Sequence, residues 1–90
     1  MNTKKIHELN QTWLGRRTLK YNLCETKSEE GFQYGIQLIV NSENQKEEIA
    51  IENISNNKQY VLDLITYLYE NAIDTIHFRD VIIDYMNSLD

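Results

Sequence analysis

The strongest constraint on this chain is an alternation of apolar residues between positions 32 and 40. The apolar positions are spaced by two: Phe32, Tyr34, Ile36, Leu38 and Val40. Because successive side chains of a strand point to opposite faces, this spacing predicts a strand with one buried face. Gly35, in the middle of the run, indicates a bulge or the close approach of a large side chain from across the sheet.

Weaker alternations flank this strand on both sides. Residues 16–25 alternate around Tyr21, and residues 47–53 alternate until Ile54 breaks the phase. The connections between the three runs are short and polar. We therefore predict an antiparallel meander of three strands, with one face left for other elements to cover.

Helical spacing replaces the alternation after residue 54. Ser55, Asn56 and Asn57 supply side-chain acceptors for a helix start, and Gln59 can complete a capping box with Asn56. The helix that follows carries an apolar stripe at spacings of three and four, which suits packing on the sheet. The stripe consists of Val61, Leu64, Ile65, Leu68 and Ala72.

A second helix is predicted after residues 71–75, which are poorer helix formers. Asp74 or Thr75 can cap it, and it should run to about Ser88. Its apolar face is wide, so some of Ile82, Ile83 and Met86 should stay exposed on a monomer or be buried in a dimer. The other apolar residues of this face are Phe78, Val81, Tyr85 and Leu89.

Ninety residues suffice for one core, so we predict a single α+β domain over residues 13–90 with the order β-β-β-α-α. Residues 1–12 are predicted to be a mobile tail or a short helix, because Ile6 and Leu9 give only a weak helical spacing. So short a chain leaves little apolar area for a deep substrate cavity beside the core.

Charge is distributed unevenly along the chain. Residues 1–27 hold six Lys or Arg against two carboxylates, and residues 28–90 hold three against twelve. So acidic a body repels phosphate and disfavours nucleic acid, while it suits a basic protein surface. The weak basic patch of Arg16, Arg17 and Lys20 follows Trp13 and is the best hint of nucleic-acid binding, but pairing with carboxylates across the sheet is the simpler interpretation.

The cysteine count and the hydropathy favour a cytoplasmic protein. Cys24 is the only cysteine, which fits a reducing compartment, and the alternation predicts it as a semi-buried or edge thiol. No secretory signal follows Met1, and no apolar run reaches the roughly 18–20 residues of a membrane span. Neither a membrane nor an exported location is expected.

The sequence contains one constellation that could bind a metal. His77, Asp80 and Asp84 share a helix face, and imidazole with carboxylates can hold a divalent ion or exchange protons. No HExxH motif accompanies them, and solvated residues near a helix start are the simpler interpretation. His7 has no nearby nucleophile, and no phosphate-binding glycine loop occurs. We therefore predict no catalytic residue, no cofactor and no metal.

The six tyrosines indicate a different kind of surface. Tyr60 and Tyr67 lie one heptad apart beside the apolar stripe of the first helix. Tyrosine is enriched where an apolar body must also reach water, as at interfaces, although partial burial at the core edge is the simpler interpretation. With Ile83 and Met86 they form the predicted protein interface.

Four segments of the chain form a recognisable set: Tyr34-Gly35-Ile36, Ile54-Ser55, Asn71-Ala72-Ile73 and residues 76–85. Together they resemble a family of short uncharacterised proteins found in clostridia and related Firmicutes, and the resemblance spans roughly residues 16–86. That family often carries a proline before the histidine of the second helix, whereas this chain has Ile76, which puts a tight entry into that helix in doubt. The family is a domain of unknown function, so the resemblance implies no activity.

The function expected from the sequence is that of a small non-enzymatic intracellular binding or regulatory protein that acts through protein-protein contact. A homodimer through the C-terminal helix or the sheet edge is one form of that contact. A phage-type acidic inhibitor that mimics nucleic acid is an alternative, motivated by the charge of residues 28–90. A small metal-dependent enzyme using His77 and Asp80 is the least favoured alternative.

Overall fold

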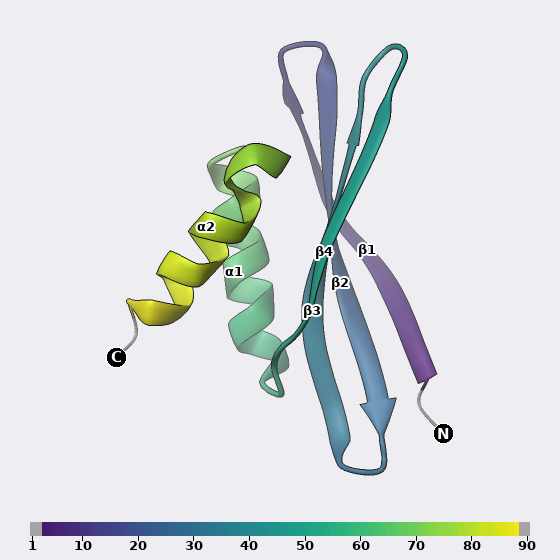
Figure 1. Cartoon of the computed structure of the whole chain (residues 1–90), viewed down its shortest axis with the longest axis vertical. Helices are drawn as coiled ribbons and strands as arrows, with labels where there is room; N and C mark the ends of the chain where they lie inside the picture. Colours follow the sequence, from purple (N-terminus) through teal and green to yellow (C-terminus); the bar gives the residue numbers. More distant parts are fainter. Residues whose placement is uncertain (1–2, 89–90) are drawn as a thin grey trace.

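Four consecutive strands form one antiparallel sheet in the order β1-β2-β3-β4, and two helices follow it (Figure 1). The computed structural model describes residues 3–88. Its elements are β1 (Thr3–Leu14), β2 (Arg17–Ser28), β3 (Gly31–Asn41), β4 (Lys46–Ser55), α1 (Lys58–Glu70) and α2 (Thr75–Asn87). The predicted α+β class is confirmed, as is an antiparallel sheet followed by two helices. Leu89, expected on the second helix, lies outside the described residues.

The prediction of three strands was wrong, because residues 3–14 form a strand rather than a tail or a short helix. This strand, β1, pairs with β2 from Thr3 opposite Lys27 to Leu14 opposite Arg17. As an edge strand it is mostly exposed and therefore shows little apolar alternation. The register shifts between Glu8 and Asn10, so Leu9 is an extra residue of β1 without a partner on β2. Leu9 is one of the two residues that had suggested helical spacing. Residues 1–2 of the predicted tail lie outside the described part of the chain.

An irregularity between β3 and β4 explains two features of the sequence. The register shifts between Tyr34 and Ile36, and Asn53 on β4 has a positive φ of 57°. Because of this kink, Ile54 packs against the core although it breaks the alternation. β4 therefore continues past the predicted end at residue 53 and ends at Ser55. The close approach at Gly35 comes from the backbone of β4 rather than from a large side chain, since an added Cβ would overlap the carbonyl oxygen of Ile51.

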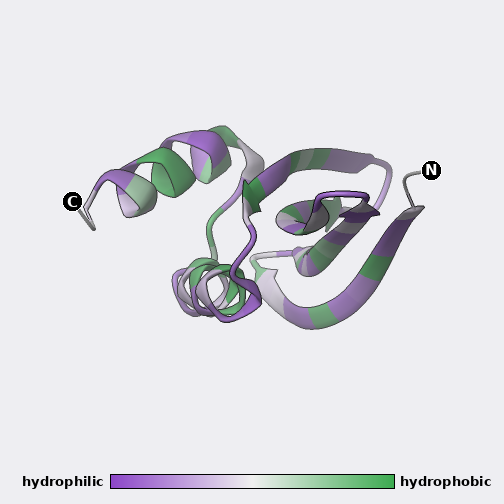
Figure 2. Cartoon of the chain, turned by 90° about the horizontal axis from the view of Figure 1, so that it is seen from below, coloured by the Kyte–Doolittle hydropathy of each residue, from purple (hydrophilic) through white to green (hydrophobic). Residues whose placement is uncertain are grey.

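The core lies between one face of the sheet and the helices. Figure 2, seen from below, shows both helices on one side of the curved sheet. α1 buries four residues of its predicted stripe, and they pack against alternate residues of β2 and β3. The buried members are Leu19, Tyr21, Leu23, Tyr34, Ile36, Leu38, Val40, Val61, Leu64, Ile65, Leu68, Phe78 and Ile82.

The other face of the sheet is also closed in part. Asn22 and Cys24 alternate with the core residues of β2, yet both are buried. Lys4 of β1 and Glu52 of β4 form an ion pair on this face, although the two strands are the opposite edges of the sheet. The sheet therefore curls until its edge strands meet over β2 and β3. The thiol of Cys24 is buried in the middle of the sheet rather than at an edge, which differs from the expectation.

None of the helices within residues 3–88 is both long and apolar enough to cross a membrane.

Candidate binding surface

The two helices begin with side-chain caps that the sequence partly predicted. The Oδ1 atom of Asn57 accepts a hydrogen bond from the backbone N–H of Tyr60 at the start of α1. Asn57 is therefore the cap, and the predicted box between Asn56 and Gln59 does not form, because Gln59 donates to Asp63 instead. Asp74 caps α2 by accepting from the backbone N–H of Thr75 at 2.7 Å.

Contacts with the sheet fix the start of α2. The hydroxyl of Tyr21 on β2 donates to the carbonyl oxygen of Ile73 at 2.7 Å. Arg17 lies 2.6 Å from the carboxylate of Asp74, and Thr75 donates to Glu47 of β4 at 3.1 Å. The first turn of α2 is thus tied to both β2 and β4.

The rest of α2 is packed much less completely. Phe78 and Ile82 are its only buried residues among those described. Ile76 is 78% exposed, Ile83 46% and Met86 38%. Their spacings of seven and three place them along one side of the helix, which we call the outer stripe (Ile76, Ile83 and Met86). Single exposed apolar residues are common, but a row of three along one helix is a candidate contact surface.

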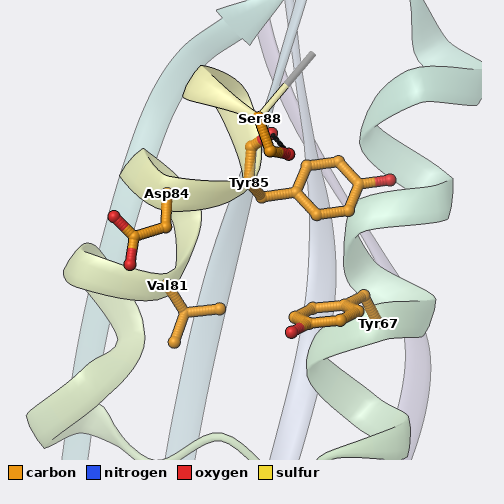
Figure 3. Close-up of a pocket in the computed structure, with 5 residues that line it drawn as sticks. All are labelled: Tyr67, Val81, Asp84, Tyr85 and Ser88. Atoms are coloured by element: carbon orange, nitrogen blue, oxygen red, sulfur yellow. Dashed lines mark hydrogen bonds between the residues drawn. The ribbon is translucent and has the colours of Figure 1, made fainter.

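A hollow of about 390 Å³ lies on the other flank of α2, between the two helices. It is lined by Tyr67 from α1 and by Val81, Asp84, Tyr85 and Ser88 from α2 (Figure 3). The four α2 residues are spaced by three, four and seven from Val81, so they share one helix face. We call this feature the tyrosine hollow.

Two aromatic rings line the tyrosine hollow, that of Tyr67 from α1 and that of Tyr85 from α2. The centroid of the Tyr85 ring lies 5.6 Å from that of Tyr67 and 5.7 Å from that of Tyr60, with tilted rings in both pairs. Such tilted arrangements are favourable for aromatic pairs. Tyr67 remains 46% exposed, so its ring is available to a molecule in the hollow.

The opposite rim of the hollow is acidic. Asp84 stands on the α2 side, and Figure 3 shows its carboxylate directed away from the two tyrosine rings. Asp80 precedes it by one helical turn, and no ion pair involves either carboxylate within residues 3–88. The last turn of α2 contains no basic residue. The hollow therefore combines an apolar floor with uncompensated negative charge at its edge.

The structure divides the predicted interface into two parts. Tyr60 and Tyr67 both contact the ring of Tyr85, and Tyr67 lines the tyrosine hollow. Ile83 and Met86 belong to the outer stripe, because Ile83 lies about 200° around the helix from Val81. The four residues predicted to act together thus flank α2 on two sides.

The weak basic patch is largely engaged within the fold. Arg17 pairs with Asp74, and Lys20 of β2 lies 2.7 Å from Glu8 of β1. Arg16 is exposed in the turn between β1 and β2. Burial alone would raise the pKa of Asp74, but the hydrogen bond from Thr75 and the Arg17 guanidinium outweigh that effect and lower it. Two of the three cations are therefore engaged in ion pairs within the fold.

The residues considered for chemistry do not converge in the described region. His77, Asp80 and Asp84 are exposed on α2, and residues 3–88 contain no group of three His, Cys, Asp or Glu placed to hold a metal ion. His7 lies in β1, with its Nε2 atom 3.7 Å from Glu25. Burial raises the pKa of the Cys24 thiol, which keeps it in the less nucleophilic protonated form.

The sequence placed Val81 and Tyr85 on one apolar helix face but did not join Asp84 and Ser88 to them. The signal was present in part, because the spacing of these four residues marks one helix face. That this face of α2 lies across from Tyr67 of α1 could not be predicted from the sequence, because it depends on how the two helices pack against each other.

A four-stranded meander covered on one face by two helices defines a small α+β domain. The chain belongs to the family of unknown function DUF6514, whose model matches residues 3–88. Neither a search of curated proteins nor a search of solved structures found a match.

Proposed function

We propose that this protein is a small non-enzymatic binding or regulatory protein that acts through protein-protein contact, and that α2 carries the contact surface. The observation that carries the proposal is the outer stripe. A helix tied down at its first turn and by Phe78 and Ile82 keeps three large apolar side chains in water. Contact with a partner would remove that apolar area from water, which is favourable.

The experiment that tests this proposal compares variants of the outer stripe with a matched exposed residue elsewhere. Ile76→Asp combined with Ile83→Asp should abolish capture of the partner from cells that produce the protein naturally. Trp13→Asp is the control, because Trp13 is 66% exposed on β1, at the other side of the sheet. Circular dichroism should show that all variants fold. Equal capture by the stripe variant and the wild type would contradict the proposal.

A second copy of the chain is one partner that the outer stripe suits, since a two-fold axis brings the same patch of both copies together. Light scattering of the wild type would then give a mass near twice 10.7 kDa. The stripe variant would give the mass of one chain. A wild-type monomer at high concentration would rule out the homodimer and leave a different protein as the partner.

We also propose a cytoplasmic location in a bacterium related to the clostridia. The single buried cysteine suits a reducing compartment, and the segments around Tyr34 and His77 resemble proteins of that group. Fractionation of the producing cells should leave the protein in the cytosolic fraction. Recovery from the membrane pellet or the medium would contradict this location.

A further inference from the structure

We propose that the tyrosine hollow receives a lysine or arginine side chain of the partner protein. The inference rests on the proposed function, because the hollow adjoins the helix that carries the contact surface. It adds the chemistry of one contacting group: a long apolar stem that ends in a cation.

The apolar part of such a side chain matches the floor of the hollow. Val81 and the rings of Tyr67 and Tyr85 provide apolar surface along its length (Figure 3). Lysine and arginine commonly lay their methylene stems on apolar surface and keep the charged head in water. A cation near a tyrosine ring also gains attraction from the negative face of the ring. A volume of about 390 Å³ is near the lower end of ligand pockets, which suits one side chain.

The charged head matches the rim of the hollow. Asp84 lines the hollow and has no cation partner within the described residues. Asp80 lies one turn earlier, and like charges at this spacing repel each other, so a cation nearby would relieve the repulsion.

The backbone of α2 also favours a cation at the hollow. Ser88 caps the C-terminal end of the helix and lines the hollow, so the negative end of the helix dipole lies there. Because no basic residue occupies the last turn of α2, this partial charge is not neutralised by the helix itself. An acidic or phosphorylated partner group would be repelled by all three of these features.

The test uses two defined peptides and the whole chain labelled with ¹⁵N. One peptide places an arginine between two glycines on each side, and the other places citrulline, its neutral counterpart, at the same position. The arginine peptide should produce saturable shifts in the amide signals of Tyr67, Val81, Asp84 and Tyr85. The citrulline peptide should bind at least about fivefold more weakly.

Charge variants locate the contact. Asp84→Asn should weaken binding of the arginine peptide about tenfold. Glu30→Gln, which removes the same charge in the turn between β2 and β3, should change it by less than about twofold. Both side chains are exposed, so neither variant should disturb the fold.

Equal binding of the two peptides, or unchanged binding by the Asp84 variant, would overturn the assignment. Its failure is distinct from failure of the proposed function. The arginine peptide could cause no amide shifts while changes in the outer stripe still abolish capture of the partner. That result would reject a basic side chain in the tyrosine hollow and would leave α2 as the proposed contact surface. Binding of arginine at the hollow without any effect of the stripe would reject the proposed surface.

Discussion

The two helices have the same length of 13 residues but contribute differently to the molecule. α1 buries four residues over the centre of the sheet, and its remaining surface is polar or tyrosine-rich. α2 buries two, and keeps the outer stripe and the tyrosine hollow accessible. One helix completes the core, and the other is held by its first turn and a narrow apolar contact. Of the two helices, α2 therefore has more apolar side-chain surface available for contact with a partner.

The largest expected effect concerns the core contribution of α1. Leu64→Ala should lower the free energy of unfolding by about 2–5 kcal/mol, because it leaves a cavity at a fully buried position. Met86→Ala on α2 should change it by no more than about 0.5 kcal/mol, since that side chain is partly in water. Urea unfolding measures both. Similar losses in the two variants would break the distinction between the helices.

A smaller effect is expected where β2 holds the segment between the helices. Tyr21→Phe removes the hydroxyl that donates to the carbonyl of Ile73 and should cost about 1–3 kcal/mol. Burial raises the pKa of Tyr21, so the hydroxyl stays protonated and able to donate. Amide shifts should move most at the first turn of α2. A loss below about 0.5 kcal/mol would show that this bond does not anchor the helix.

The smallest of these anchoring effects depends on pH. Because folding lowers the pKa of Asp74, its charge adds stability that is complete above the ordinary carboxyl pKa of about 3.9 and is lost as pH falls through the lowered value. Asp74→Asn keeps a capping side chain but removes the charge. It should cost about 0.5–1 kcal/mol at neutral pH, and this cost should shrink as pH falls below the ordinary carboxyl pKa and through the lowered one.

Urea unfolding of both proteins across that range measures the effect. A difference between Asp74→Asn and the wild type that persists at low pH would mean that the charge on Asp74, and its ion pair with Arg17, is not the cause.

The central strands and both helices could be predicted because each has one side in the core. Apolar residues alternate from Phe32 to Val40 and repeat at helical spacing from Val61 to Leu68. These spacings predict which side of each element is buried. β1 could not be predicted because an edge strand buries little, and a bulge breaks what pattern it has. Asn22 lies on the polar face of β2 in the sequence pattern, yet it is buried because the sheet curls. This curl is a tertiary feature that the residues around Asn22 do not predict.

The candidate surface could be predicted only in part. Tyr67, Ile83 and Met86 were identified from their residue types and helical positions, and all three are exposed. Their separation into the outer stripe and the tyrosine hollow depends on the rotation of α2 about its axis and on where it crosses α1. These are tertiary relations between segments far apart in the chain.

The most direct test of the central claim compares two adjacent isoleucines of α2 by urea unfolding. Ile82 is 1% exposed and Ile83 is 46% exposed. If the inner side of α2 builds the fold and the outer side is left for contact, Ile82→Ala should lose about 2–5 kcal/mol. Ile83→Ala should stay within about 0.5 kcal/mol of the wild type. A loss for Ile83→Ala as large as that for Ile82→Ala would make the outer stripe part of the fold and contradict its assignment as a contact surface.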